Sequence, residues 1–583
     1  MKAFMRKAAM DPDFGEIMTR FMAEQSNLDK EFSQNYKLSY LKKREFLMPF
    51  RSISFLGFLF LMVSITQFAE ASSSHSQLGK IEFPTSGSGE AQRHFLHGVA
   101  ALHSFWYKEA LEAFRQSTEA DSSFVMGYWG EAMAHNHPLW EEQDEQLARE
   151  ALSKITGISG LTSREQAYLD AVKLLYGEGD KPSRDEAYSH AMGKIHRDYP
   201  GDLEAACFYA LALLGVAQNP LHKFSLKVKA GAIGMEVFSK NPDHPCAAHY
   251  TIHAFDHPDL AVLALPAARR YAQIAPASHH AQHMPAHIFV QLGMWPEAAA
   301  SNEAGWQNSV DWVERERLDK GRRDYHSLQW LHYVYLQQGR YEKADEIFQL
   351  KIKHMTEADD GSTNKDRVGR YFERMVGATV FENESWESAA TLKEPPGWNP
   401  NSYSKAVLTF VRGFAAAMQG SKDAVRHLAD LRAIRNRGFK EDYFKRPERL
   451  EIWDLEIQAA MKVSDKEYEE ATTLMKKATA IEEKMPVPSG PPKIIKPTYE
   501  LSGEILLRAG RPKEAMLQFA FSLSRHPNRM RSLLGAARSA VRSGDRKEAA
   551  RRYSRFLEIW KQADLNLPEL KEARSYLEQK SMR

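Results

Sequence analysis

The feature that most constrains the fold of this chain is a spacing of 34 residues that recurs along it. Pro242 and Pro276 are 34 positions apart, and so are Ala515 and Ala549. This is the length of a repeat that consists of two antiparallel helices. After residue 90, runs of β-branched residues are scarce, whereas Ala, Leu, Glu, Tyr and Lys recur at helical spacing. The sequence therefore predicts an all-α protein built from helical hairpins.

A short motif marks the turns of the predicted hairpins. It contains a small residue, in most copies an aromatic residue or Pro at the turn, an Ala early in the second helix, and a large residue four positions later. Small residues let two helices approach closely, and large side chains fill the groove opposite them. The copies are Gly98 with Trp106–Ala110 and Phe114, Gly293–Ala298, Gly339–Ala344 with Phe348, Gly510–Ala515 with Phe519, and Gly544–Ala549 with Tyr553.

This motif resembles the tetratricopeptide repeat. The resemblance covers most of residues 91–565, and it implies an α-solenoid, a superhelix of stacked helical hairpins. It also implies a scaffold that binds a protein or peptide ligand. The motif specifies a fold and not an activity, so the function has to be argued from other residues.

Composition divides the chain into seven segments. Pro-rich stretches at 394–402 and 485–497 interrupt the repeats, and the second is predicted to be a hinge. The predicted segments are an N-terminal extension (1–47), a signal peptide or signal anchor (48–71), a linker (72–90), an N-terminal repeat array with a His-rich groove (91–355), an irregular helical-hairpin segment (356–484), the hinge (485–497), and a C-terminal repeat pair with a capping helix (498–583).

The N-terminal region is predicted to carry a targeting signal. Residues 53–69 are nearly all apolar or small, basic residues precede them, and Ala69-Glu70-Ala71 forms a small-residue cleavage pattern. The segment that starts at Met48 has the features of a complete signal peptide, which favours a mis-assigned start or a long leader for residues 1–47. The alternative is an uncleaved anchor, and only this segment would then contact a membrane. Both interpretations predict a body outside the cytosol, secreted or periplasmic.

The charge balance argues against a nucleic-acid partner. The 583 residues include 78 Lys and Arg and 76 Asp and Glu, which gives a formal net charge of +2. Nucleic-acid binders carry a strongly basic domain instead. The two cysteines, Cys207 and Cys246, are too few for a disulfide framework. The count of 22 His is high, and many of them lie between positions 244 and 332.

Two pairs of histidines repeat with the hairpin period. His249 and His253 form one pair, His283 and His287 form the other, and each residue is 34 positions from its counterpart. Residues four apart lie on one face of a helix. Neighbouring helices pack about 8–10 Å apart, so imidazoles from both would reach one shared metal ion. These four histidines are the main candidate metal ligands.

The resemblance to tetratricopeptide repeats implies where these side chains lie. In that family, positions 2, 5, 9, 12 and 13 of the first helix line the concave groove, and the two pairs fall at positions 5 and 9. Asp256 and Asp324 lie nearby in the sequence, and we expect them to orient imidazoles as hydrogen-bond acceptors. The further candidate ligands on the same surface are Cys246, His257, His280 and His326, and an earlier unit adds Trp129 and His137 as groove residues.

A groove lined by imidazoles favours zinc or copper, and a cysteine ligand would shift the preference towards softer ions. The spacing of each pair matches half of the H-E-x-x-H motif of metalloproteases. However, Tyr250 and Met284 stand where that motif has its general-base Glu. The sequence therefore favours an extracytoplasmic binding scaffold with a histidine metal site over an enzyme. A metal-free interaction module and a metal-dependent enzyme of unknown substrate are the alternatives.

Overall fold

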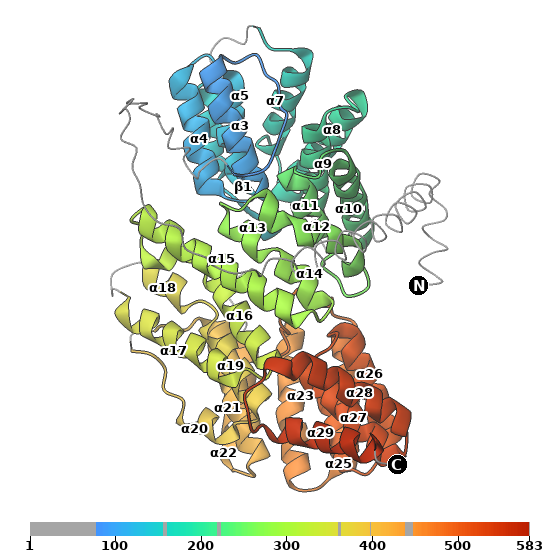
Figure 1. Cartoon of the computed structure of the whole chain (residues 1–583). Helices are drawn as coiled ribbons and strands as arrows, with labels where there is room; N and C mark the ends of the chain where they lie inside the picture. The colour runs from blue at the N-terminus through green and yellow to red at the C-terminus, as the bar shows by residue number, and fades with distance from the viewer. Residues whose placement is uncertain are drawn as a thin grey trace, which may run out of the picture. The chain divides into compact units, whose positions relative to one another are not determined.

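The computed structural model describes residues 77–155, 160–218, 223–358, 363–396, 398–437 and 447–581 (Figure 1). The predicted N-terminal extension (1–47) and signal segment (48–71) lie outside the described residues, as does the start of the linker. None of the helices in the described ranges combines the length and the apolar character that a bilayer crossing requires.

The described chain is an all-α array of helical hairpins, as the sequence predicts. Two strands of two residues each, β1 and β2, pair antiparallel, with Asn136 opposite Gln143. The elements before the histidine-rich stretch are α3 (Gly89–His103), α4 (Tyr107–Ala120), α5 (Val125–Ala134), β1 (Asn136–His137), η2 (Pro138–Trp140), β2 (Glu142–Gln143), α6 (Glu145–Ser153), α7 (Ser163–Leu175), α8 (Lys181–Asp198), α9 (Leu203–Val216) and α10 (Lys223–Lys240).

The histidine-rich stretch and the hairpins that follow it complete the array. The central elements are α11 (Pro245–Ala254), α12 (Ala261–Ile274), α13 (His279–His283), α14 (Pro285–Gln291), α15 (Trp295–Arg315), η3 (Lys320–Arg322), α16 (Tyr325–Gln337) and α17 (Tyr341–Glu357). The last elements are α18 (Thr363–Gly369), α19 (Phe372–Asn383), α20 (Trp386–Thr391), α21 (Ser402–Met418), α22 (Asp423–Arg437), α23 (Pro447–Ser464), α24 (Tyr468–Glu483), α25 (Thr498–Arg508), α26 (Pro512–Arg525), α27 (Met530–Ser543), α28 (Arg546–Ile559), η5 (Trp560–Gln562) and α29 (Pro568–Ser581).

The repeat motif explains how consecutive helices pack. Phe114 of α4 is fully buried between α3 and α5. A Cβ added to Gly98 would lie 2.7 Å from the Phe114 ring, and one added to Gly130 would lie 2.3 Å from it. The glycines are therefore required because the large ring occupies the space that any side chain would need. Small and large residues of the motif thus interlock across three successive helices.

The Pro-rich segment 485–497 packs against the central helices. Gly490 lies under the indole of Trp330, so close that a Cβ there would be 2.1 Å from the ring. The side-chain amide of Gln291 donates to the carbonyl oxygen of Pro488 at 2.9 Å. Ile494 and Ile495 belong to a hydrophobic cluster that also contains Leu328 and Trp453. These contacts place the segment next to α14 and α16, and its role as a hinge stays a prediction.

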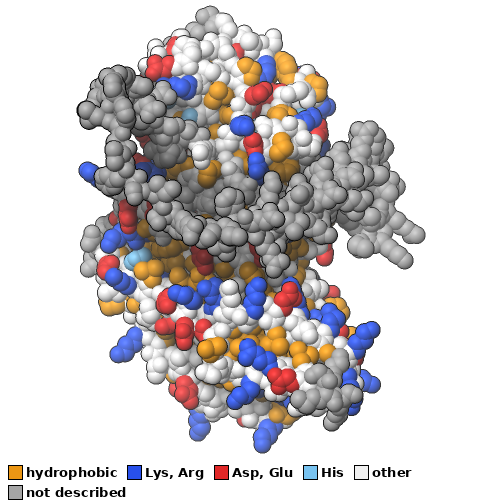
Figure 2. Space-filling view, in the orientation of Figure 1, with side chains coloured by type: hydrophobic (Ala, Val, Ile, Leu, Met, Phe, Trp, Pro, Cys, Tyr) orange, Lys and Arg blue, Asp and Glu red, His pale blue; other side chains and the backbone are white. Residues whose placement is uncertain are grey.

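Basic and acidic side chains are interspersed on the molecular face seen in Figure 2, and hydrophobic side chains appear between them. The visible, described part of this face has no continuous basic area.

Candidate metal centre

Four first helices of successive hairpins begin in the same way. The residue before each helix has a non-helical backbone conformation. These residues are Asp202, His244, Ser278 and Asp324 for α9, α11, α13 and α16. Counting from the first helical residue, the fifth residue of one helix meets the second residue of the next. We call this contact a junction. The three junctions join Cys207 to Cys246, His249 to His280, and His283 to His326.

The first triad consists of His249, His253 and His280. The Nε2 atom of His249 is 3.1 Å from the Nε2 atom of His253 and 3.1 Å from that of His280. His253 is the ninth residue of the same helix as His249, and His280 comes from the next hairpin. The ring of Phe105 contacts all three imidazoles, with centroid distances of 4.3, 5.6 and 5.7 Å. Three ring nitrogens therefore converge beside one aromatic wall.

The second triad consists of His283, His287 and His326, and it repeats the first. The Nε2 atoms of His283 and His287 are 3.2 Å apart, and the His326 ring lies 4.8 Å from the His283 ring. Trp330 contacts all three imidazoles here, at 5.1, 4.4 and 5.3 Å between centroids. Within each triad, one donor atom from each side chain lies within 4.8 Å of the other two.

The two triads are neighbours. The rings of His253 and His287, which occupy the same position in successive hairpins, lie 6.1 Å apart. Pro285 lacks an N–H group and separates α13 from α14, yet His283 and His287 stay on one side, with ring centroids 5.1 Å apart. The repeat period thus carries the same three-imidazole arrangement from one hairpin to the next.

Hydrogen bonds fix which nitrogen of the central imidazoles carries the proton. His249 Nδ1–H donates to the carbonyl oxygen of His103 at 2.6 Å. His283 Nδ1–H donates to Asn302 Oδ1 at 2.7 Å, and Asn302 Nδ2 donates to a backbone carbonyl, which sets the orientation of the amide. His287 Nδ1–H donates to the carboxylate of Asp256 at 2.7 Å. In the neutral form of each ring, the lone pair then lies on Nε2.

As a consequence, two lone pairs face each other in the second triad. When both rings are neutral, the Nε2 atoms of His283 and His287 are both acceptors, and they stand 3.2 Å apart. A ligand distance of about 2.0–2.1 Å in a tetrahedral zinc site separates two nitrogens by roughly 3.3 Å. The observed separation of the nitrogens matches this value. A cation between the rings would convert a repulsive contact into two favourable ones.

Burial favours the neutral form of five of the six imidazoles, the form that binds metal. The pKa of His249 is lowered to about 3 and that of His283 to about 4, mainly because both rings are fully buried. Burial also lowers the pKa values of His253, His280 and His326 well below the usual range, and neighbouring imidazoles add to the effect. His253, His280, His287 and His326 are partly exposed, and the His287 side chain is 12% exposed, so the triads contact solvent at their edge.

Asp256 lies where the sequence predicts, as an acceptor for an imidazole. Its Oδ2 accepts from His287 and its Oδ1 accepts from Gln291 at 2.9 Å. Asp324 instead caps α16 through the backbone N–H groups of His326 and Ser327, and its Oδ2 lies 3.7 Å from His279 Nδ1. Asp324 is therefore linked to the second triad by capping the helix that carries His326.

Several other predicted residues lie away from the triads. His257 lies beyond α11, where its ring contacts Phe224 and its Nδ1 accepts from the Asp259 N–H. His137 packs on the ring of Tyr107 at 3.8 Å and belongs to neither triad. The prediction of Trp129 as a groove residue is wrong. Its indole is fully buried among Phe83, Phe95, Tyr168 and Phe208, because a large ring at this position fills the core between hairpins.

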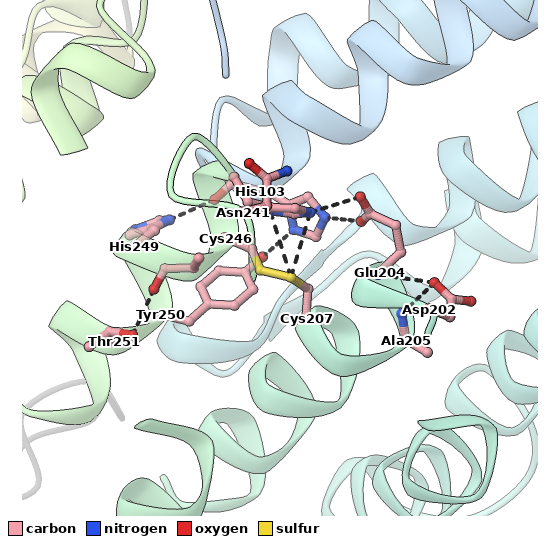
Figure 3. The surroundings of a disulfide bond; sticks show 12 residues. His103, Asp202, Glu204, Ala205, Cys207, Asn241, Cys246, His249, Tyr250 and Thr251 are labelled. Carbon is pink, nitrogen blue, oxygen red and sulfur yellow. Dashed lines mark hydrogen bonds and ion pairs between the residues drawn. A yellow bond between two sulfur atoms is a disulfide. The ribbon is translucent and has the colours of Figure 1, made fainter. Parts of the chain in front are cut away.

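Cys246 is a second correction. We expected it beside the histidines, but it forms a disulfide with Cys207 (Figure 3). Both sulfurs are buried next to His244, and the carboxylate of Glu204 lies between His244 and His103. The junction geometry explains the difference, because the fifth position of the preceding helix holds a Cys and not a His.

The sequence reasoning missed the residues that support the triads. Asn302 and the His103 carbonyl fix the tautomers, and Phe105 and Trp330 cover the rings. These residues come from other helices, and no spacing rule links them to the histidines. The position of His326, second in its helix, is the one signal that groups it with His280.

No protein-family model matches the chain, and no curated relative does. Solved structures with similar helical arrangements include the TPR domain of P58(IPK), with 14% identity, a TM-score of 0.21, and coverage of 64% of this chain and 99% of that one. A human IFIT1 dimer with m7Gppp-AAAA has 12% identity, a TM-score of 0.30, and coverage of 85% and 90%. Naa15/Naa10 bound to HypK-THB has 12% identity, a TM-score of 0.23, and coverage of 84% and 74%. At these scores the similarity does not indicate a function, so the function is inferred from the chemistry of the site.

Proposed function

We propose that this chain is an extracytoplasmic helical-repeat protein that binds transition-metal ions, one at each histidine triad. The observation that carries the proposal is the pair of Nε2 lone pairs that face each other between His283 and His287, 3.2 Å apart, with both Nδ1 protons already donated. A cation between these two nitrogens would satisfy both lone pairs at once.

The donor set favours zinc or copper. Each triad offers three neutral imidazoles, which suit both ions, and no thiolate joins either triad. Three protein ligands leave a coordination position open for water or another ligand. The hairpin array supports a scaffold role, in which a protein or peptide partner is bound near the ions. The Cys207–Cys246 disulfide agrees with the predicted export, because such bonds persist outside the cytosol.

The direct test is elemental analysis of protein purified without an affinity tag. We expect about two equivalents of zinc or copper per chain in the wild type and none in a His253→Ala/His287→Ala variant. His257→Ala is the matched control, because His257 is close in sequence and outside both triads. Metal that survives in the double variant would refute the assignment of ligands. A wild-type chain that binds no metal would favour a metal-free peptide-binding module.

A further inference from the structure

The disulfide occupies the same place in its junction as the histidine contacts do in theirs. Cys207 is the fifth residue of α9 and Cys246 is the second residue of α11. The next two junctions place His249 against His280 and His283 against His326 at these same positions. In all three junctions, the side chains at these two positions are therefore close enough to share one ion.

A third donor stands beside the cysteines. His244, the residue before α11, has its Nδ1 3.8 Å and its Nε2 3.9 Å from Cys207 Sγ, so the sulfur lies beside both ring nitrogens. Its Nε2 donates to Glu204 Oε1 at 3.0 Å, and this bond leaves Nδ1 with its lone pair free to bind a metal. The other oxygen of Glu204 accepts from His103 Nε2 at 2.6 Å, which holds the carboxylate in place. A hydrogen-bonded carboxylate behind a histidine is the usual support of a metal ligand.

We propose that Cys207, Cys246 and His244 form a third metal site, which takes one Zn2+ when the disulfide is reduced. Reduction breaks the S–S bond, and a dithiol or phosphine reductant supplies the two electrons while solvent or the dithiol supplies two protons. Zinc binding then displaces the two thiol protons to solvent. The reduced form of the chain therefore binds one ion more than the disulfide form.

The chemistry of the site favours zinc there. Two thiolates and one imidazole are an established donor set for Zn2+. All three side chains are buried, and two thiolate charges neutralise the dication, which lowers the cost of placing it in the protein interior. The site uses none of the six triad histidines, so the inference stands independently of the proposed function.

Cobalt(II) tests the site because a thiolate bound to cobalt absorbs in the near ultraviolet and an imidazole does not. The full chain would be produced in a reducing cytosol, purified anaerobically, and divided into reduced and air-oxidised samples. Thiol titration after unfolding confirms two thiols in the first sample and none in the second. We expect the near-ultraviolet band and one additional cobalt equivalent in the reduced sample alone.

Two variants separate this site from the triads. Cys207→Ser/Cys246→Ser should lack the band and the additional equivalent, whereas His253→Ala/His287→Ala should keep the band although both triads are disabled. A folded, reduced wild type with two titratable thiols and no band would overturn the proposal. This comparison of two samples of the same chain needs no variant to fold.

Discussion

Two groups of buried histidines lie on adjoining helices and differ in what their ring nitrogens face. Around Glu204, the Nε2 atoms of His103 and His244 each meet a carboxylate oxygen, and His103 Nδ1 meets the hydroxyl of Tyr250 at 2.8 Å. In the triads, the Nε2 atoms face one another. While the disulfide is intact, the first group is paired with acceptors of the chain, whereas we propose that a cation pairs the nitrogens of the second. Burial alone therefore does not identify a metal ligand, whereas the partner of the second ring nitrogen does.

The largest expected effect is the loss of one bound ion when a single triad histidine is replaced. His287→Ala should remove the ion of the second triad and leave one equivalent, because His287 supplies one of its three nitrogens. His253→Ala should remove only the ion of the first triad. Elemental analysis with His257→Ala as control measures both. If either substitution released both ions, the six histidines would form one shared site and not two.

In the disulfide form, removing the carboxylate between His103 and His244 should damage folding and not metal binding at the triads. Glu204→Ala leaves two buried imidazoles without an acceptor, so we expect the free energy of unfolding to fall by about 3–5 kcal/mol. Urea unfolding measures the loss, and the exposed Glu178→Ala is the control. A stable Glu204→Ala protein with less metal in the triads would reverse the comparison between the two groups.

The Glu204 carboxylate should also make the free energy of unfolding depend on pH in the acid range. The pKa of Glu204 is lowered to about 2, although burial alone would raise it, because the neighbouring His244 and His103 stabilise the ionised form. Its stabilising contribution is therefore complete above pH 4.5 and disappears as pH falls towards 2. This amounts to about 3 kcal/mol over the interval. Unfolding of metal-free wild type and Glu204→Gln should show a shallower pH dependence for the variant, and equal slopes would contradict this assignment.

The smallest expected effect is a change in metal affinity when Asp256, the hydrogen-bond acceptor of His287, loses its charge. Asp256→Asn keeps an oxygen acceptor for His287 Nδ1–H but removes its charge. We expect roughly 10-fold weaker metal binding at the second triad, at the low end for such changes, and unchanged binding at the first. Competition with a metal chelator measures both affinities. Asp259→Asn, at an exposed position, is the control, and an equal loss at both triads would show that Asp256 acts on the whole fold.

The sequence was sufficient to predict the hairpins, because the 34-residue period and the glycines opposite Phe114 are local patterns. It was also sufficient to place the two histidine pairs in register. It predicted one four-imidazole patch, whereas the structure has two triads. The third ligand of each triad comes from the start of the next hairpin. The interval from His283 to His326 is longer than that from His249 to His280, partly because α15 has 21 residues and α12 has 14.

Residue type alone misled us at Cys246 and Trp129. Both occupy positions where a groove residue is expected, but the outcome depends on which side chain the neighbouring helix presents. Cys246 meets Cys207, and Trp129 meets an aromatic core. Tertiary neighbours of this kind leave no periodic signal in the sequence.

The contact of Trp330 with the second triad gives the protein an internal optical reporter. Its indole lies 4.4 Å from the His287 ring, whereas the first triad has Phe105 against its rings and Trp140 farther away, 6.4 Å from the His280 ring. Cu2+ at the second triad would quench the emission of Trp330 strongly. The difference between wild type and Trp330→Phe would then follow the filling of one triad in the presence of the other, so the order of loading becomes measurable without separating the ions.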